Sequence, residues 1–232
     1  MQKTFRFAFL HSLPVMFGYI FLGIAFGLVL QEAGFGMPWA FASSLLIYAG
    51  SMQFLLPSLL LSGSWLEIAV MTVLVNGRHL FYGLSFIEKF KQMGKSYFYM
   101  IFSLTDETYS VLCSLTDIPK DVNEKQASFL IALFDHFYWI LGSVTGALVG
   151  QYIAFDSRGI DFSMTALFVV IFLDQWKGSK NHIPALLGLG IGVSALILLG
   201  AEHFLLPALI LTVGVLILLR PHMLKKEGND HV

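Results

Sequence analysis

Long apolar stretches follow one another along almost the whole chain, and this pattern constrains the fold more than any other feature. A helix needs about 20 apolar residues to cross the hydrocarbon core of a bilayer. Only 12% of the residues are charged, whereas a soluble domain has roughly 25%, so lipid must cover most of the surface. The sequence predicts an all-α polytopic membrane helix bundle, with residues 1–232 as a single membrane domain and 221–232 as its polar C-terminal tail. Eight stretches are apolar enough to enter the bilayer: 7–30, 39–61, 65–87, 97–115, 129–153, 162–175, 184–200 and 203–219.

Several functional classes are disfavoured by the composition and motifs of the chain. The net charge is -1, and no basic tract indicates nucleic-acid binding. The single cysteine, Cys113, cannot form an internal disulfide or a cysteine-based metal cluster. The sequence has no HExxH, GxSxG or phosphate-binding glycine motif. We therefore expect a protein that is not an enzyme and that needs no cofactor or metal.

The positions of Lys and Arg predict how the helices are oriented, because cytoplasmic loops hold the excess of positive charge. Basic residues concentrate at the N-terminus (Lys3 and Arg6), at 89–95, at 177–180 and in the C-terminal tail. All four basic segments face the cytoplasm if the stretches 65–87 and 162–175 each enter and leave on one side. This arrangement has about six full spans plus two broken or re-entrant elements. The alternative, with both stretches as full spans, places residues 89–95 outside.

The two halves of the chain share a pattern of tyrosine and glycine. In the favoured arrangement the fifth stretch runs opposite to the first, so the shared pattern indicates an inverted repeat at about 7–90 and 127–200, a plan found in many secondary transporters. Chance similarity between apolar helices is the alternative. Beyond the glycines each half also has a glutamine, Gln53 or Gln175. The matching residues have a constant offset: Tyr19, Gly23 and Gly27 with Tyr138, Gly142 and Gly146.

Helix-breaking residues inside two of the apolar stretches indicate a cavity. Gly50 and Ser51 interrupt the second stretch, and a polar cluster at 76–79 lies near the middle of the third. Backbone groups that a break leaves without helical partners are tolerated at membrane depth only when buried in protein or lining a wet cavity. We therefore expect breaks at 48–53 and 76–79, with Gly50, Ser51 and Gln53 supplying neutral hydrogen bonds to a solute. Kinked helices without a function are the alternative.

Charged residues within the apolar stretches are the strongest indication of a polar cargo. An Arg or Asp at the centre of a bilayer costs roughly 2.5–3.5 kcal/mol, against about 0.3–0.6 kcal/mol gained per Leu or Phe. Arg78, flanked by Asn76 and His79, therefore needs partners, and we expect these to be Asp106 or Glu107. Successive helical residues point in different directions, so one of these carboxylates can hold Arg78 while the other takes up and releases protons. A structural ion pair is the alternative.

A second polar pair, Asp135 and His136, lies in the fifth stretch. Each side chain suits either a proton relay or a hydrogen-bonded contact between helices. We favour the contact for His136 and leave both interpretations open for Asp135.

Four segments of the first half resemble a known family. They are SLPVMFGYIFLGIAFG (12–27), IYAGSMQF (47–54), NGRHLFYG (76–83) and SLTDETY (103–109). In this order and spacing they are similar to the AzlC family, the large subunit of bacterial branched-chain amino-acid exporters. Thr105 joins the candidate site residues as part of the last motif. No binding residues are carried over from the family.

The resemblance implies a multi-pass protein of the bacterial inner membrane that exports leucine, isoleucine and valine. It implies a secondary transporter, and we expect coupling to a proton gradient. It also implies a small AzlD-type membrane subunit as a separate chain. A zwitterionic amino acid has a carboxylate and an ammonium group, which Arg78 and either Asp106 or Glu107 would complement. A carrier or channel for another small polar solute is the alternative.

Overall fold

The computed structural model describes residues 1–115, 118–152, 169, 172–173, 176–177, 181–200 and 204–229. The side chains of 62, 78, 80–81, 205–206 and 220–229 are outside this description. Every regular element in the described ranges is a helix, which confirms the all-α prediction. The chain divides into two compact units, 1–166 and 167–232, which we describe separately.

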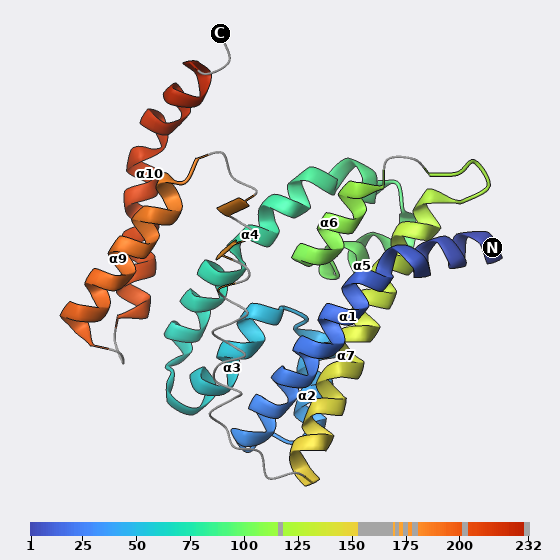
Figure 1. The fold of residues 1–232 in the computed structure, drawn as a ribbon, viewed down its shortest axis with the longest axis horizontal. Coiled ribbons are helices and arrows are strands. Elements are labelled where there is room, and N and C mark those ends of the chain that lie inside the picture. Colours follow the sequence, from blue (N-terminus) through green and yellow to red (C-terminus); the bar gives the residue numbers. More distant parts are fainter. Residues whose placement is uncertain are drawn as a thin grey trace. The chain divides into compact units, whose positions relative to one another are not determined.

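In its described residues the first unit has three long helices, α1, α4 and α7, and several short ones (Figure 1). α1 and α7 are long and apolar enough to cross a membrane, and the count of six full spans stays a prediction. At 1.5 Å per residue, the 31 residues of α1 extend over roughly 46 Å, more than the hydrocarbon thickness of about 30 Å. The elements are α1 (Gln2–Glu32), α2 (Met37–Leu46), α3 (Gly50–Ser62), α4 (Trp65–Lys91), a 3-10 turn (Gly94–Ser96), α5 (Tyr97–Phe102), α6 (Asp106–Ser114) and α7 (Glu124–Tyr152).

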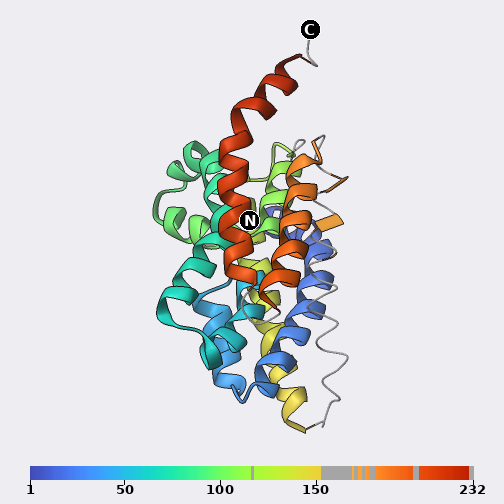
Figure 2. The same ribbon diagram turned by 90° about the vertical axis from the view of Figure 1, so that its left-hand side faces the viewer.

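α1 and α7 run in the same direction and pack side by side along most of their length (Figures 1 and 2). Near their starts the rings of Phe5 and Phe134 are 5.2 Å apart, and further along Gly27 packs against Gly146. The prediction that these helices run in opposite directions is therefore wrong. The matching tyrosine and glycine residues of the two halves do not mark an inverted pair of helices, because most of them form the two sides of one interface.

Glycine allows the backbones of α1 and α7 to touch. A Cβ atom on Gly23 would lie 2.9 Å from the backbone nitrogen of Ser143. A Cβ atom on Gly27 would overlap the carbonyl oxygen of the same serine, and one on Gly146 would overlap the carbonyl oxygen of Ile24. Membrane helices commonly pack closely in this way where small residues recur every four positions.

We expect Gly27→Ala to lower the free energy of unfolding by about 1–3 kcal/mol, the usual effect of forcing an extra carbon into a packed contact. Gly18→Ala is the matched control on the same helix, since a Cβ there has nothing within 4 Å. The control should be neutral or slightly stabilising, because alanine is favoured over glycine within a helix by about 0.5–1 kcal/mol. Thermal unfolding in detergent measures both variants. Equal melting temperatures would contradict this helix contact.

α2 and α3 form a hairpin, which we call the first hairpin, that begins and ends near the C-terminal end of α1. Near the C-terminal end of α2 the carbonyl oxygen of Ser44 lies 3.0 Å from Nε2 of His136. After residues 47–49, α3 returns, and Phe54 packs against Phe26 further along α1. The predicted break in the second stretch is confirmed, but the prediction that 39–61 is one full span is wrong.

α5 and α6 form the second hairpin, which begins and ends near the N-terminal end of α1. α5 places the ring of Phe102 5.7 Å from His136. After residues 103–105, α6 returns, so that Leu112 packs with Ile131 and Ala8. The prediction of one full span over 97–115 is therefore wrong. It is this stretch, rather than 65–87, that turns back within the protein.

α4 is continuous from Trp65 to Lys91, so the predicted break at 76–79 is wrong. Its polar residues are accommodated by contacts with α6 rather than by unwinding. His79 lies 3.6 Å from Asp106, and the ring of Tyr82 stacks on Tyr109 at 4.5 Å. These two α4 residues are three positions apart and share one helix face.

The N-terminus and the loop before α7 meet at one end of the first unit. Lys3 Nζ donates to Asp121 Oδ2 at 2.6 Å, and this hydrogen bond lowers the pKa of the Asp121 carboxyl group. The hydroxyl of Thr4 accepts a bond from the backbone nitrogen of Asn123. α7 starts at the same end as α1 because each hairpin returns to the end it came from, while α4 connects the two ends.

The second unit contains α9 (Ile183–Leu199) and α10 (Leu205–Asn229), which pack together. They confirm the helices predicted at 184–200 and 203–219, and α10 continues into the polar tail. The predicted element at 162–175 and the repeat glutamine Gln175 lie outside the described residues, apart from isolated positions. The basic segment 177–180 is described only at residue 177.

Candidate functional site

The tips of the two hairpins, residues 47–49 and 103–105, meet about halfway along α1 and α7. Tyr48 of the first tip lies 6.2 Å from Phe102, next to the second tip, and 6.4 Å from Tyr19 of α1 (ring centroids). Tyr48 has a φ of 46°, a left-handed conformation that costs a non-glycine residue roughly 1–3 kcal/mol and is typical of functional sites. We regard this meeting point as the candidate site.

Gln53 holds the first tip in place. The side chain is fully buried, and its Oε1 accepts bonds from the backbone nitrogen of Ala49 and from Nε1 of Trp139, both at 3.0 Å. Its neighbours Gly50 and Ser51 form the start of α3, and a Cβ on Gly50 would lie 3.4 Å from the Trp139 ring. These bonds hold the tip in position, and the expected role of Gln53 in bonding a solute stays a prediction.

We expect Gln53→Leu to destabilise the protein by about 2–6 kcal/mol. The variant removes the acceptor of two buried donors, on Ala49 and Trp139, and each unsatisfied donor costs about 1–3 kcal/mol. Gln126→Leu, at an exposed position of α7, is the matched control and should unfold like the wild type. Denaturation of the purified proteins compares them. A Gln53→Leu protein as stable as the control would mean that this amide does not hold the tip.

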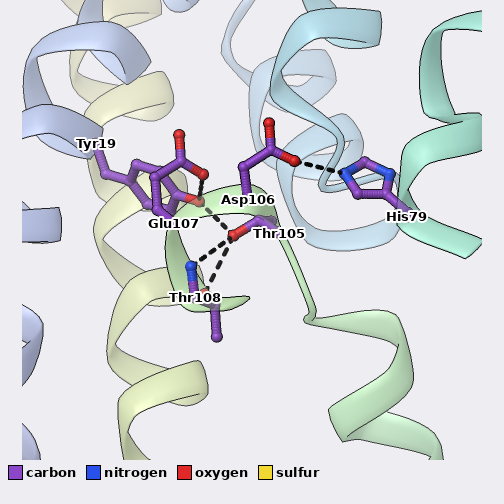
Figure 3. Close-up of polar contacts among 6 residues, drawn as sticks. All are labelled: Tyr19, His79, Thr105, Asp106, Glu107 and Thr108. Atoms are coloured by element: carbon purple, nitrogen blue, oxygen red, sulfur yellow. Dashed lines mark hydrogen bonds and ion pairs between the residues drawn. The ribbon is translucent and has the colours of Figure 1, made fainter. Parts of the chain in front are cut away.

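The second tip is built as the start of a helix. The hydroxyl of Thr105 caps α6 by accepting a bond from the backbone nitrogen of Thr108 at 3.3 Å. The next two residues point in different directions (Figure 3). Asp106 faces α4 and pairs with His79, while Glu107 accepts a bond from the hydroxyl of Tyr19 on α1 at 2.7 Å. The expected divergence of the two carboxylates is confirmed.

A series of hydroxyl groups continues from the second tip to Asp135. The hydroxyl of Tyr19 is 2.6 Å from that of Thr105, which is 3.1 Å from that of Thr108. Thr108 in turn donates to Asp135 Oδ2 at 2.8 Å. Asp135 is 0% exposed, and its other oxygen, Oδ1, has no hydrogen-bond partner within the described part of the chain. Such a carboxyl group can hold a proton.

His136 lies beside Asp135 but bonds elsewhere. Its Nδ1 is 3.1 Å from the hydroxyl of Tyr99, and its Nε2 is 3.0 Å from the carbonyl oxygen of Ser44. It thereby connects α5, α7 and the first hairpin. The predicted role as a contact between helices is confirmed.

The third apolar stretch, 65–87, brings fewer of its predicted residues to the site. Asn76 is half-buried, and among the described residues its Oδ1 has no hydrogen-bond partner. Arg78 lies on α4 next to His79, but its side chain is outside the described residues, so the expected pairing with Asp106 or Glu107 stays a prediction. No three His, Cys, Asp or Glu side chains come close enough to hold a metal ion in the ranges that the structure describes.

Three residues at the meeting point were absent from the predicted site: Tyr19, Tyr48 and Thr108. Tyr19 was noted only as part of the repeat pattern. Thr105 is of a residue type favoured at the start of a helix, and Thr108, three positions later, lies on the same side of that helix, so the two could have indicated the helix start and the shared direction of their hydroxyls.

The two helices that start at the tips, α3 and α6, favour ligand groups of opposite charge. The N-terminal end of a helix carries a partial positive charge. The first turn of α3 has no acidic residue, so this end can attract a carboxylate, as discontinuous helices do in transporters. The first turn of α6 has Asp106 and Glu107, which attract a cation. Together the tips suit a small zwitterion.

Comparison with known proteins identifies relatives over most of the chain. The family model described as AzlC protein matches residues 14–153. The Bacillus subtilis (strain 168) protein named branched-chain amino acid transport protein AzlC is 40% identical, over 97% of this chain and 88% of its own. An uncharacterized membrane protein of Helicobacter pylori (strain J99) is 41% identical, over 95% and 97%. The Escherichia coli (strain K12) inner membrane protein YgaZ is 31% identical, over 83% and 82%. No solved structure matches the chain.

Proposed function

This chain belongs to the AzlC protein family, and from that premise we propose that it is a secondary transporter that exports branched-chain amino acids. The substrates are leucine, isoleucine and valine, with methionine as an overlapping substrate. The B. subtilis relative is named for the transport of branched-chain amino acids, which supports the substrate class. The proposal places the chain in the bacterial inner membrane as a multi-pass protein.

The meeting of two opposed hairpin tips is the observation that carries this proposal. Each tip is a break between two short helices, and such breaks are tolerated within a membrane where they are buried in protein or line a cavity. The start of α3 would bind the substrate carboxylate. Asp106 would bind the ammonium group. Arg78 is a further candidate for the carboxylate on the basis of its residue type.

The proposed substrate range is broad because an apolar pocket distinguishes poorly between similar side chains. Aromatic rings surround the tips, including Tyr48, Trp139 and Phe102, and they suit a branched apolar side chain. A pocket distinguishes side chains that differ by one methylene group by only about 1–3 kcal/mol. We therefore propose overlapping transport of the branched-chain amino acids rather than strict selection of one.

Two further parts of the proposal concern energy and assembly. Export is coupled to the proton gradient, and the buried carboxyl group of Asp135 is suited to carry the proton. The transporter works with a small AzlD-type membrane subunit. The subunit is proposed from the family resemblance, and the proton coupling from the ionisable groups near the tips.

An efflux experiment tests the proposal. Cells are loaded with a leucine-containing dipeptide, and leucine release is followed with this chain alone, the small subunit alone, and both. We expect faster efflux only with both chains. Unchanged efflux with both present would refute the proposed substrate. Efflux that neither saturates nor responds to the proton gradient would instead support a passive channel.

A further inference from the structure

Two carboxyl groups at the site are joined by an unbroken series of hydroxyl groups. Glu107, Tyr19, Thr105, Thr108 and Asp135 form four successive oxygen–oxygen contacts of 2.7, 2.6, 3.1 and 2.8 Å. They come from α1, α6 with its cap, and α7, so the series depends on the tertiary structure. Figure 3 shows its first three contacts. Glu107 is exposed, whereas Asp135 is fully buried.

The number of hydrogen atoms that the four contacts need determines how many protons the two carboxyl groups hold. An ionised carboxylate only accepts hydrogen bonds, and each hydroxyl has one hydrogen to donate. If both carboxyl groups were ionised, the hydrogens of Tyr19 and Thr108 would go to Glu107 and Asp135. Thr105 would then have one hydrogen for its two hydroxyl contacts, at 2.6 and 3.1 Å. One of these contacts would lack a hydrogen.

One added proton satisfies all four contacts. If it is on Asp135, every hydrogen points toward Glu107, and if it is on Glu107, every hydrogen points toward Asp135. We propose that Glu107 and Asp135 share one proton, and that Tyr19, Thr105 and Thr108 relay it between the exposed and the buried carboxyl group. This inference rests on the proposed function and identifies the coupling site of that transporter.

The transfer conserves every hydrogen in the series. The O–H bond of Glu107 breaks as its proton passes to the Tyr19 oxygen, and the hydrogen of Tyr19 passes to Thr105. Thr105 and Thr108 each receive one hydrogen and pass on their own. A new O–H bond forms on Asp135, Glu107 becomes a carboxylate, and the three hydroxyls keep one hydrogen each.

The other titratable groups around Asp135 do not replace the relay. His136 bonds to Ser44 and Tyr99, and among the described residues no hydrogen bond or ion pair joins it to Asp135. Tyr48 and Tyr99 also face this part of the site, as does Asp106 beside Glu107.

Infrared spectroscopy tests the shared proton without any substrate. The wild-type complex in detergent should show the C=O stretch of one protonated carboxyl group that disappears in Glu107→Gln and equally in Asp135→Asn. Either amide can donate a hydrogen into the series, so either variant removes the need for the extra proton. A band that survives Glu107→Gln, or no such band in the wild type, would overturn the proposal.

Transport in proteoliposomes tests the relay. Tyr19→Phe and Thr108→Val should reduce leucine accumulation driven by a pH gradient by at least about tenfold, since positioned proton transfer contributes about 10²–10⁴ in rate. Exchange of labelled for unlabelled leucine, which needs no net proton movement, should stay within about twofold of the wild type. Thr108→Ser, which keeps the hydroxyl, should retain both activities.

Tyr138→Phe is the matched control for Tyr19→Phe. Tyr138 lies on α7 and its hydroxyl contacts Ser12 at 3.2 Å, outside the relay, so this variant should retain accumulation and exchange. If Tyr19→Phe retains accumulation, or loses exchange as well, the relay is wrong. A wild-type protein that moves no leucine would refute the proposed function, while the infrared result would still decide whether the proton is shared.

Discussion

Asp106→Asn is expected to abolish leucine export while the protein still accumulates in the membrane. The carboxylate stands at the start of α6 at the second tip, with a side chain 26% exposed and 3.6 Å from His79. In the proposed function it binds the substrate ammonium group. Removing one partner of a desolvated charge pair costs about 2–5 kcal/mol, and each 1.4 kcal/mol is a factor of ten. We therefore expect export to fall by about 30-fold to 3,000-fold.

Asp121→Asn is the matched control for this experiment. Asp121 is also a carboxylate, but it lies in the loop before α7 and pairs with Lys3, far along α1 from the tips. Its replacement should leave efflux unchanged. Export is measured as leucine efflux from dipeptide-loaded cells, and the amount of each variant by immunoblot of the membranes. Normal efflux with Asp106→Asn would remove this residue from the mechanism, and loss of the protein itself would indicate a structural ion pair with His79.

The sequence predicted the helical class and the two long helices because their apolar runs exceed the length of a span. It also predicted the break in the second stretch, since Gly50 and Ser51 are poor helix formers within an apolar run. It did not predict the break at 103–105, because residues 97–115 were treated as one apolar stretch although Asp106 and Glu107 lie within it. The signal was present in Thr105 followed by two acidic residues, which is typical of a helix start.

In the third stretch the error was the reverse, because a break was predicted where the helix is continuous. Asn76 and Gly77 are unfavourable in an isolated helix, yet α4 continues through them. Tertiary contacts of its polar face with α6 stabilise the helix, as the contact between His79 and Asp106 illustrates. Local propensity is a weak predictor where such contacts exist. Which charged groups meet depends on these contacts, so spacing along the chain could nominate Asp106 and Glu107 but not the roles of Tyr19 and Thr108.

The direction of α7 was the largest error, because 39–61 was predicted as a full span and one additional hairpin reverses every helix after it. Positive charge in loops predicts only which ends are cytoplasmic. It does not distinguish a hairpin at 65–87 from hairpins at 39–61 and 97–115, because both arrangements place the N-terminus and residues 89–95 on the same side. The contact of Lys3 with Asp121, which places α1 and α7 in the same direction, joins residues 118 positions apart and has no local signal.

Cysteine labelling should show that the N-terminus and the loop before α7 lie on the same side of the membrane. Lys3→Cys and Asp121→Cys are placed singly in a Cys113→Ala protein and exposed to a membrane-impermeant maleimide. The ion pair that they disrupt is 76% and 51% exposed, and exposed pairs contribute little to stability. With a cytoplasmic N-terminus, both cysteines should react only after permeabilisation.

Glu32→Cys provides the opposite reference. This exposed residue ends α1, and a helix of this length carries it beyond the far face of a bilayer, so it should react in intact cells. The arrangement predicted from charge alone implies that Asp121→Cys reacts together with Glu32→Cys, and the structure implies that it reacts together with Lys3→Cys. Because the maleimide either labels a cysteine in intact cells or does not, the result decides between the two arrangements. Labelling of Asp121→Cys in intact cells would mean that α7 runs opposite to α1, and the meeting of the hairpin tips between these helices could not stand.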